Sequence, residues 1–243
     1  MTKCINHKDD AMGQALMDYQ KGLRGAALIV GTSVADDEPY DVSYFFRSFD
    51  EMPELEQKAL ELAKGDILDV GAGTGIHSLA LAQMNKSCTS IDISELSVEV
   101  MKLRGVSDAH CVDFYKIENQ KYDTLLFLMN GIGLVETLDG FNAFFKQCRK
   151  LLRPGGQILF DSSDLIYLFE EEDGSFLIEF GDKYYGEVDF RIEYKEMKAK
   201  PFPWLFVDFD NMANMAEKNG FEAEMILNGS HYDYLARLTL KLP

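Results

Sequence analysis

The stretch Ile67-Leu68-Asp69-Val70-Gly71-Ala72-Gly73-Thr74-Gly75-Ile76-His77 decides the fold of this chain. Residues 67–70 are a mostly apolar run typical of a buried strand, and glycines at alternate positions follow it directly. Residues 78–82 then favour a helix. A strand, a glycine turn and a helix are how an open α/β sheet builds a nucleotide site. Glycine lets the backbone approach a ligand, and the helix start presents free N–H groups to it.

The spacing of these glycines selects the ligand. A dinucleotide-binding turn has the pattern G-x-G-x-x-G, and counted from Gly71 its third glycine falls on Ile76. The pattern present is D-x-G-x-G-x-G, which resembles the first motif of the class I S-adenosylmethionine-dependent methyltransferases. The resemblance implies that the turn wraps the methionine part of S-adenosylmethionine and that Asp69 helps hold its ammonium group. The implied cofactor-binding residues of the turn itself are Gly71, Ala72 and Gly73. The alternative is a tight turn without a ligand.

A second acidic residue follows the next predicted strand. Residues 88–91 are strand-like and end at Asp92, about twenty residues past the turn, where a carboxylate can bind both hydroxyls of a ribose. The alternative role for Asp92 is to cap a helix, but Ser94 is the better cap for a helix over 95–104. This leaves Asp92 free for a ligand, with Ile93 beside it as a further candidate cofactor contact.

Two more strand ends carry candidate site residues. A predicted strand over 109–112 ends in Asp113 and Phe114, and the resemblance implies that they meet the adenine amino group and ring. A continuously apolar strand over 122–128 ends in Met129 and Asn130, which in the family face cofactor and substrate. Asn130 is expected to hold a substrate polar group or the methionine carboxylate, unless it forms only a turn.

The remaining segments complete a Rossmann-like α/β fold. We expect a single domain over residues 1–243: a seven-stranded, mostly parallel sheet with helices on both faces and a terminal antiparallel hairpin, as the resemblance implies. The predicted later elements are a helix over 139–152, a strand over 157–160 after Arg153-Pro154-Gly155-Gly156, a helix over 208–219, and strands over 221–227 and 234–240.

Two segments lie outside this core. Residues 1–50 form an N-terminal cap or lid segment, with a rough helical stripe over 10–25, aromatic residues over 40–46, and Asp50 as the expected cap of the next helix. The alternative is a segment that only packs on the domain edge. Residues 165–204 read as a β-rich insertion near the substrate side, with short runs over 176–180 and 188–194. Its basic and aromatic cluster is either a solvated edge or a substrate-binding or dimer surface.

Composition limits the classes of partner. The formal net charge of −17 argues against broad binding of nucleic acid or of an anionic membrane. The cysteines, Cys4, Cys88, Cys111 and Cys148, have no paired spacing and are interpreted as reduced thiols, Cys88 and Cys111 as buried ones, in a cytoplasmic protein. The histidines show no metal-ligand spacing. We expect a monomer or homodimer without metal.

The expected reaction is methyl transfer from S-adenosylmethionine to a small-molecule acceptor by in-line displacement. The charged sulfonium is already a good leaving group, so the protein mainly aligns the nucleophile and excludes water. Asp161, Tyr44 and the loop after Asn130 are candidates to face the acceptor, and no catalytic base is assigned. The alternative function is a sensor or scaffold that binds the cofactor or its product without methylating. An NAD(P) oxidoreductase is disfavoured by Ile76.

Overall fold

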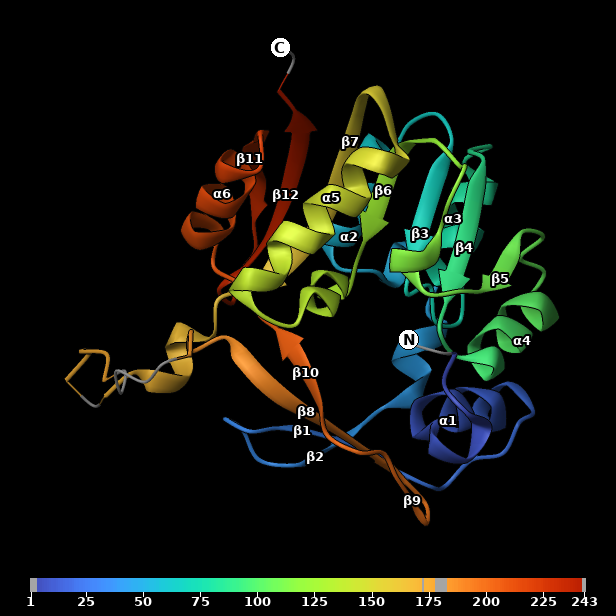
Figure 1. Ribbon diagram of the computed structural model, residues 1–243. Helices are drawn as coiled ribbons and strands as arrows, with labels where there is room; N and C mark the ends of the chain where they lie inside the picture. The colour runs from blue at the N-terminus through green and yellow to red at the C-terminus, as the bar shows by residue number, and fades with distance from the viewer. Residues whose placement is uncertain (1–3, 172, 178–182, 242–243) are drawn as a thin grey trace.

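A seven-stranded sheet forms the centre of the computed structural model, which describes residues 4–171, 173–177 and 183–241. In Figure 1 it crosses the upper part of the molecule. The strands, in spatial order, are β11 (Phe221–Asn228), β12 (Asp233–Leu240), β7 (Leu152–Ser163), β6 (Tyr122–Phe127), β3 (Ile67–Val70), β4 (Cys88–Asp92) and β5 (Ala109–Cys111). β7 to β5 are parallel, and β12 is antiparallel to both β7 and β11. The predicted mostly parallel sheet with a terminal antiparallel hairpin is confirmed.

The strand order places a switch point at β3. β4 lies on one side of β3 and β6 on the other, so the chain leaves β3 in one direction along the sheet and later returns to its opposite side. In open α/β sheets the crevice beside such a point, at the carboxyl ends of the strands, is where ligands bind. The glycine turn after Val70 lies at this point.

Helices cover both faces of the sheet, as expected. The helices are α1 (Ala11–Gln20), α2 (Glu54–Leu62), α3 (Ile76–Gln83), α4 (Glu95–Arg104), α5 (Phe141–Leu151) and α6 (Phe209–Lys218). The short 3-10 helices are η1 (His7–Asp9), η2 (Val42–Phe46), η3 (Phe49–Glu51), η4 (Phe114–Lys116), η5 (Gly131–Val135), η6 (Leu138–Gly140) and η7 (Leu165–Phe169). Leu126 and Leu159 pack with α2 and α3, whereas Phe127 packs with α5 and α6 on the other face. This alternation explains why the central strands are apolar throughout.

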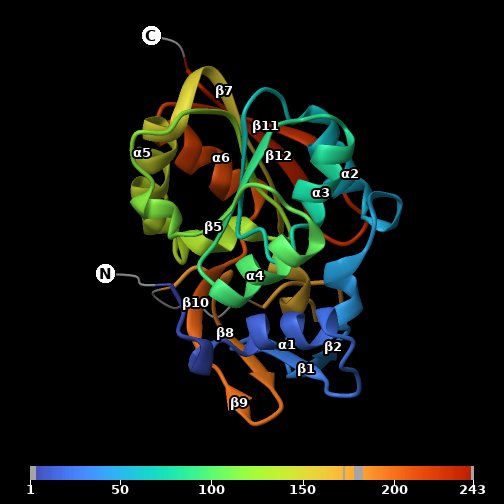
Figure 2. The same cartoon turned by 90° about the vertical axis from the view of Figure 1, so that its right-hand side faces the viewer.

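A second, antiparallel sheet joins the N-terminal segment to the insertion. Its order is β10 (Phe202–Leu205), β8 (Glu187–Tyr194), β1 (Leu28–Thr32) and β2 (Glu38–Tyr40), and β9 (Met197–Lys198) pairs with β8. Figures 1 and 2 both place this sheet and α1 beyond the carboxyl ends of the parallel strands. The sequence gives no sign of this pairing, because β1 and β8 are brought together from more than a hundred residues apart.

Several local expectations need correction. Asp50 does not cap α2: it lies inside η3, and Pro53 is the residue before the helix. Glu51 takes part in a capping box at Ser48 instead, where its carboxylate accepts the Ser48 N–H at 2.7 Å. Cys88 and Cys111 are free thiols but only half-buried. The β-like run over 176–180 lies partly outside the described residues.

The two sheets meet where Trp204, the single tryptophan of the chain, packs against Gly133. A Cβ on Gly133 would lie 2.1 Å from the Trp204 indole nitrogen, so Gly133→Ala must displace the ring. We expect a red shift of the tryptophan emission and a loss of about 1–3 kcal/mol in unfolding free energy. Gly131→Ala is the control, since the nearest atom to a Cβ there is the Phe127 Cβ at 3.5 Å. Identical emission spectra for both variants would contradict this packing.

Candidate functional site

The turn after β3 leaves its backbone open to a ligand. Gly71, Gly73 and Gly75 all have positive φ, at 71°, 57° and 76°, which side chains rarely tolerate. A Cβ on Gly71 would meet no atom within 4 Å, and one on Gly73 would meet only the Gly71 carbonyl at 4.0 Å. Gly75 differs, because a Cβ there would lie 2.7 Å from Val106. The first two glycines therefore border open space, and the third allows α3 to pack against its neighbour.

Asp92 connects the tip of β4 to this turn. One carboxylate oxygen accepts the Gly73 N–H at 2.9 Å, and the other accepts the Ser94 N–H at 2.8 Å. The hydroxyl of Ser94 caps α4 by accepting the Ser97 N–H at 2.9 Å, as the sequence predicted. Burial raises the pKa of Asp92 to about 6 despite the two N–H donors. Each oxygen keeps a lone pair for a further donor, which is what binding a ribose diol requires.

The other two carboxylates lie within or just after neighbouring strands. Asp69 is buried in β3, where it accepts the hydroxyl hydrogen of Ser78 at 2.6 Å, and burial raises its pKa. Asp113 follows β5 and caps η4 by accepting the Tyr115 N–H at 2.9 Å. Residues 92 and 111 are register partners of the parallel pair β4 and β5, so Asp113 lies just beyond the tip that carries Asp92. The three carboxylates thus share one edge of the sheet.

The apolar candidates are divided between core and surface. Phe114 is 4% exposed and packs edge-on against Phe127 of β6, with the ring centroids 5.3 Å apart. Its neighbour Tyr115 is 38% exposed, as is Ile93, whose carbonyl accepts the Ile5 N–H at 2.7 Å. The described geometry therefore makes Phe114 primarily a core residue, and it gives Ile93 a role in holding the N-terminal segment.

Met129 and Asn130 form a strained turn at the tip of β6. Both have φ in the left-handed region, 57° and 55°, a conformation that accumulates at functional sites. The side chain of Asn130 accepts the Ser162 hydroxyl hydrogen at 3.0 Å and donates to the Leu205 carbonyl at 3.3 Å. Its amide therefore connects β7 with β10 and so links the two sheets.

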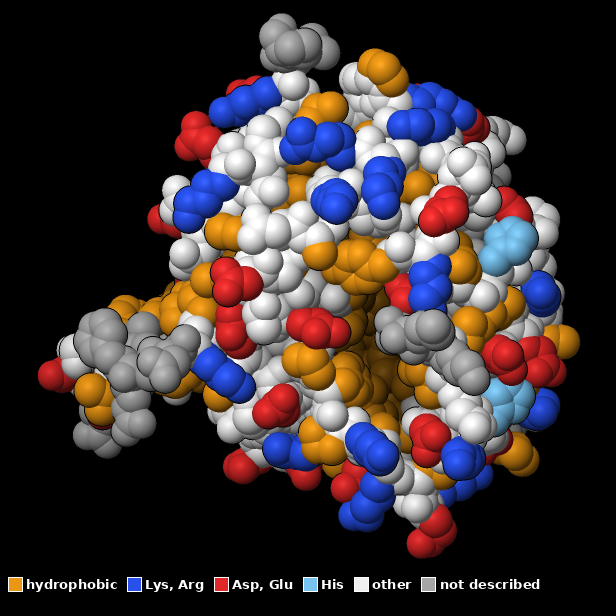
Figure 3. Space-filling view, in the orientation of Figure 1, with side chains coloured by type: hydrophobic (Ala, Val, Ile, Leu, Met, Phe, Trp, Pro, Cys, Tyr) orange, Lys and Arg blue, Asp and Glu red, His pale blue; other side chains and the backbone are white. Residues whose placement is uncertain are grey.

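The hollow at this edge is visible in the space-filling view. Figure 3 shows a depression between the parallel-strand ends and the lower sheet, with mainly hydrophobic walls. Polar groups come from the strand tips, and apolar surface comes from the elements that face them. Such a combination suits a small organic ligand held by a few directed polar contacts.

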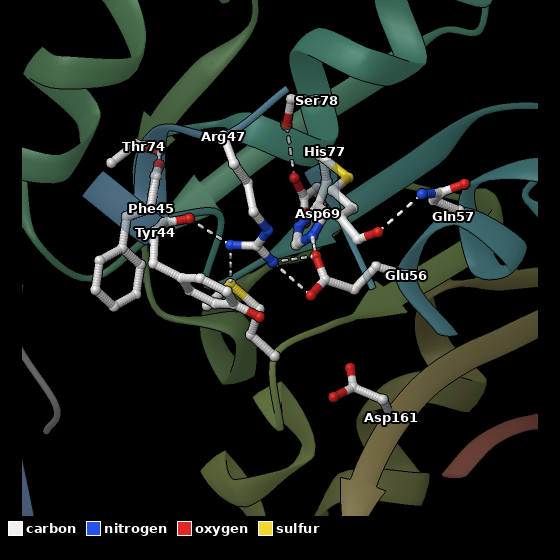
Figure 4. Close-up of polar contacts among 12 residues, drawn as sticks. Tyr44, Phe45, Arg47, Glu56, Gln57, Asp69, Thr74, His77, Ser78 and Asp161 are labelled. Atoms are coloured by element: carbon white, nitrogen blue, oxygen red, sulfur yellow. Dashed lines mark hydrogen bonds and ion pairs between the residues drawn. The ribbon is translucent and has the colours of Figure 1, made fainter. Parts of the chain in front are cut away.

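A buried network of charged residues lies at one side of this edge, and the sequence analysis did not predict it. Arg47 binds both carboxylate oxygens of Glu56, one at 2.5 Å, and Glu56 also contacts the His77 Nε2 at 2.7 Å (Figure 4). All three residues are less than a tenth exposed. The guanidinium carbon lies 3.7 Å from the centre of the Tyr44 ring. One sequence signal for this network was available. Glu56 precedes Leu60 by four positions, so the sequence places a charged residue on the apolar face of α2.

The charges in this network compensate one another. Burial on its own raises the pKa of Glu56, but the hydrogen bond from His77 and the positive charges of His77 and Arg47 outweigh it, so the pKa is lowered. The carboxylate therefore stays ionised. Because its oxygens are occupied by Arg47 and His77, Glu56 acts as an anchor for the N-terminal segment and not as a free base.

The same segment is fastened directly to the glycine turn. The hydroxyl of Thr74 donates to the Phe45 carbonyl. Arg104 donates to the Thr74 carbonyl at 2.8 Å and to its hydroxyl oxygen at 2.7 Å, and the guanidinium carbon lies 4.9 Å from the centre of the Phe46 ring. The aromatic stretch at residues 40–46 consequently lies beside the turn that the sequence identified as the cofactor loop.

Asp161 of β7 contributes a carboxylate with a free oxygen. One oxygen accepts the Asn130 N–H at 2.9 Å, and the other is buried and has no hydrogen-bond partner among the described residues. Burial raises its pKa to about 6, with Glu56 adding to the effect while the Asn130 N–H and His77 oppose it. Figure 4 shows Asp161 projecting from β7 toward the space below Tyr44 and Glu56.

Within residues 4–171, 173–177 and 183–241, no group of His, Cys, Asp and Glu side chains is arranged to hold a metal ion. Over the same ranges, every helix is too short or too polar to cross a bilayer.

Comparison with known proteins identifies relatives for both the sequence and the fold. A family model described as a methyltransferase domain matches residues 68–160. The chain is similar to a SAM-dependent methyltransferase from Bacteroides fragilis, solved in complex with S-adenosylhomocysteine, with 48% identity, 99% coverage of both chains and a TM-score of 0.93. A Bordetella avium ubiquinone biosynthesis O-methyltransferase is 27% identical over 112 residues, which are 44% of this chain and 46% of that protein. The chain thus spans less than half of that curated relative. The CcbJ methyltransferase from Streptomyces caelestis shares the fold at 16% identity, with 84% of this chain and 100% of that chain covered and a TM-score of 0.60.

The buried network predicts a large cost for removing its cation. Arg47→Met leaves Glu56 buried without its guanidinium, so we expect the unfolding free energy at pH 7 to fall by about 3–5 kcal/mol in urea titration. Arg191→Met is the control, because its ion pair with Asp37 is exposed and contributes little. The pKa of Glu56 is lowered in the folded state, so the stabilisation lost in Arg47→Met is present above about pH 4.5 in the wild type and disappears on further acidification. Equal stabilities of the two variants would contradict this role.

The raised pKa of Asp161 predicts a pH-dependent gain in Asp161→Asn. Between its ordinary value of 3.8 and about 6, the folded chain keeps a proton that the unfolded chain has lost. Wild-type stability therefore falls as pH rises through this window, and the amide variant does not share the fall. We expect Asp161→Asn to be more stable than wild type at pH 7.5 by roughly 2–3 kcal/mol, with the difference shrinking toward pH 4. A difference independent of pH, measured by denaturant titration, would refute the shift.

Proposed function

This chain belongs to the S-adenosylmethionine-dependent methyltransferases, and we propose that it transfers the sulfonium methyl group to a small-molecule acceptor by in-line displacement. The observation that carries the proposal is the covered edge at the glycine turn. The N-terminal segment is bonded to that turn through Phe45 and Thr74, so it covers part of this edge. A site that is partly covered by the chain itself suits a small acceptor better than a protein or nucleic acid.

The residues at the edge fit the cofactor. Gly71 and Gly73 border open space, so their backbone can lie against the methionine part of S-adenosylmethionine. The spare lone pairs of Asp92 suit the ribose hydroxyls, and the buried carboxyl groups of Asp69 and Asp113 lie at the neighbouring strands β3 and β5. The bound cofactor supplies a methyl group on a positively charged sulfur. The chain's own task is to orient the acceptor behind that methyl and to exclude water.

The acceptor is proposed to be largely apolar and uncharged or cationic. The walls of the hollow in Figure 3 are mainly hydrophobic. The ring centroids of Tyr40, Tyr44 and Phe45, in the segment bonded to the glycine turn, lie within 6.3 Å of one another. An anionic acceptor would meet the carboxylate of Asp161, which has no ion pair among the described residues, whereas Glu56 is paired with Arg47 and His77. The O-methyltransferase name of the curated relatives is consistent with a hydroxyl acceptor, although it concerns proteins that match this chain over less than half of their length.

The two segments outside the sheet are proposed to form the acceptor side of the site. We infer that residues 1–50 act as the lid and that the insertion at 165–204 forms the opposing wall. The pairing of β1 with β8 and the contact of Trp204 with Gly133 support this division, because they connect both segments to the strand-end edge.

Release of S-adenosylhomocysteine tests the proposed activity. Purified protein is incubated with S-adenosylmethionine and a panel of phenols, aliphatic alcohols and amines, and the product is measured by a coupled assay. We expect release above the acceptor-free rate with at least one apolar hydroxyl or amine. Tight cofactor binding without release from any acceptor would instead favour a cofactor-binding sensor.

Asp92 provides a test of the cofactor site. Asp92→Ala removes hydrogen bonds to the ribose and the anchor of the Gly73 N–H, so we expect S-adenosylmethionine binding to weaken by about 2–3 kcal/mol. Calorimetry with S-adenosylmethionine and S-adenosylhomocysteine measures this. Asp66→Ala is the control, since it makes the same charge change at the opposite end of β3, where Asp66 pairs with Arg153. Unchanged affinity in Asp92→Ala, or binding of NAD in preference to both ligands, would reject the assigned site.

A further inference from the structure

We propose that Asp161 accepts the proton of the acceptor nucleophile, and that the acceptors of this enzyme therefore carry an O–H or N–H at the methylated atom. This inference rests on the proposed function. It assigns a catalytic base to the reaction, whereas the sequence named Asp161 only as a candidate to face the acceptor.

The carboxylate of Asp161 is fixed in place but not saturated. The Asn130 N–H holds one oxygen at 2.9 Å, and the rigid left-handed turn at Met129 and Asn130 sets the direction of that N–H. The second oxygen is buried and has no partner among the described residues. A buried acceptor without a donor is costly, so such a group is expected to acquire its donor when a ligand arrives.

The alternation of side chains along a strand places Asp161 on the same face of the sheet as Asp69. Leu159, two positions earlier in β7, packs in the same cluster as Ile67, which lies two positions before Asp69 in β3. Side chains two positions apart share a face, so Asp161 and Asp69 extend from the same face of the sheet. Only β6 separates β7 from β3. The cofactor is expected over β3 and β4, and Asp161 then lies on the β6 side, where an acceptor must approach.

The groups around Asp161 leave it as an available base. Glu56 faces it from α2, His77 from α3, Tyr44 from η2 and Tyr234 from β12. Glu56 is occupied by Arg47 and His77, and the Tyr234 hydroxyl donates to the Val207 carbonyl at 2.8 Å. Among the described residues, Asp161 has no ion pair of its own. Burial raises its pKa to about 6, so at neutral pH the carboxylate is largely ionised yet more basic than an exposed aspartate.

The proton transfer balances the charges of the reaction. The lone pair of the hydroxyl or amine forms the new bond to the methyl carbon, and the carbon–sulfur bond breaks with its electrons moving to sulfur. S-adenosylhomocysteine leaves with a neutral sulfur. The proton of the O–H or N–H passes to the free oxygen of Asp161, which becomes a carboxylic acid. A positive sulfonium and a negative carboxylate are thus neutralised in one step, which a buried site favours. The proton later returns to water.

A cofactor analogue tests this geometry without a known acceptor. In sinefungin, a carbon bearing an amino group replaces the methylated sulfur, so its amine occupies the place of the transferred methyl. We expect Asp161→Asn to weaken sinefungin about tenfold in calorimetry while S-adenosylhomocysteine affinity stays within about twofold. Asp161 is ionised only above its pKa, so the wild-type preference for sinefungin over S-adenosylhomocysteine should rise between pH 5 and pH 7 and stay flat in the variant.

Asp164→Asn is the matched control, because it neutralises a carboxylate three positions away that already accepts from Tyr185 at 2.6 Å. It should change neither affinity. If Asp161→Asn binds both ligands as wild type does, or weakens both equally, Asp161 is not beside the methyl and the inference is overturned. If wild type binds neither ligand, the proposed function itself fails. Once an acceptor is found, Asp161→Asn should lower kcat and remove the acidic limb of its pH profile.

Discussion

The functional edge is arranged around one backbone turn whose glycines carry no side chains. Gly71 and Gly73 take left-handed φ values and border open space at the end of β3. Because the neighbouring strands are parallel, their carboxyl ends reach the same edge, and each tip presents a polar residue there. The bond from the Gly73 N–H to Asp92 fixes the turn against β4. A side chain in this turn would project into the open space and would strain the left-handed backbone that directs the Gly73 N–H to Asp92.

The covering segment is held by electrostatics as much as by apolar packing. The Arg47 guanidinium is buried, and its cost is offset by Glu56, His77 and the Tyr44 ring. This network joins the N-terminal segment to α2 and α3, while Thr74 joins the same segment to the glycine turn. Among the residues that the structure describes, the buried carboxylate oxygen without a partner belongs to Asp161. Glu56 is fully engaged, whereas Asp161 keeps an oxygen that is available for the proposed proton transfer.

The sequence predicted the features that depend on residues close to one another in the chain. The apolar strands, the glycine turn, Ser94 as a cap and the terminal hairpin depend on neighbours within a few positions, and the structure confirms them. It did not predict the pairing of β1 with β8 or the network at Arg47, because their partners are distant in the chain. Asn130 lies in a turn, which was one of the two roles expected of it, and its side chain also joins the two sheets. Its contact with a ligand stays a prediction. Asp50 failed as a cap because Ser48 and Glu51 form the competing box.

A crystal structure of the protein soaked with S-adenosylhomocysteine tests the central claim most directly. The ribose hydroxyls should lie within hydrogen-bond distance of Asp92, the amino-acid part should follow Gly71 to Gly73, and the sulfur should face the side of β6 and Asp161. Density for the ligand at any other surface, or an adenosyl group that leaves Asp92 without a contact, would contradict it.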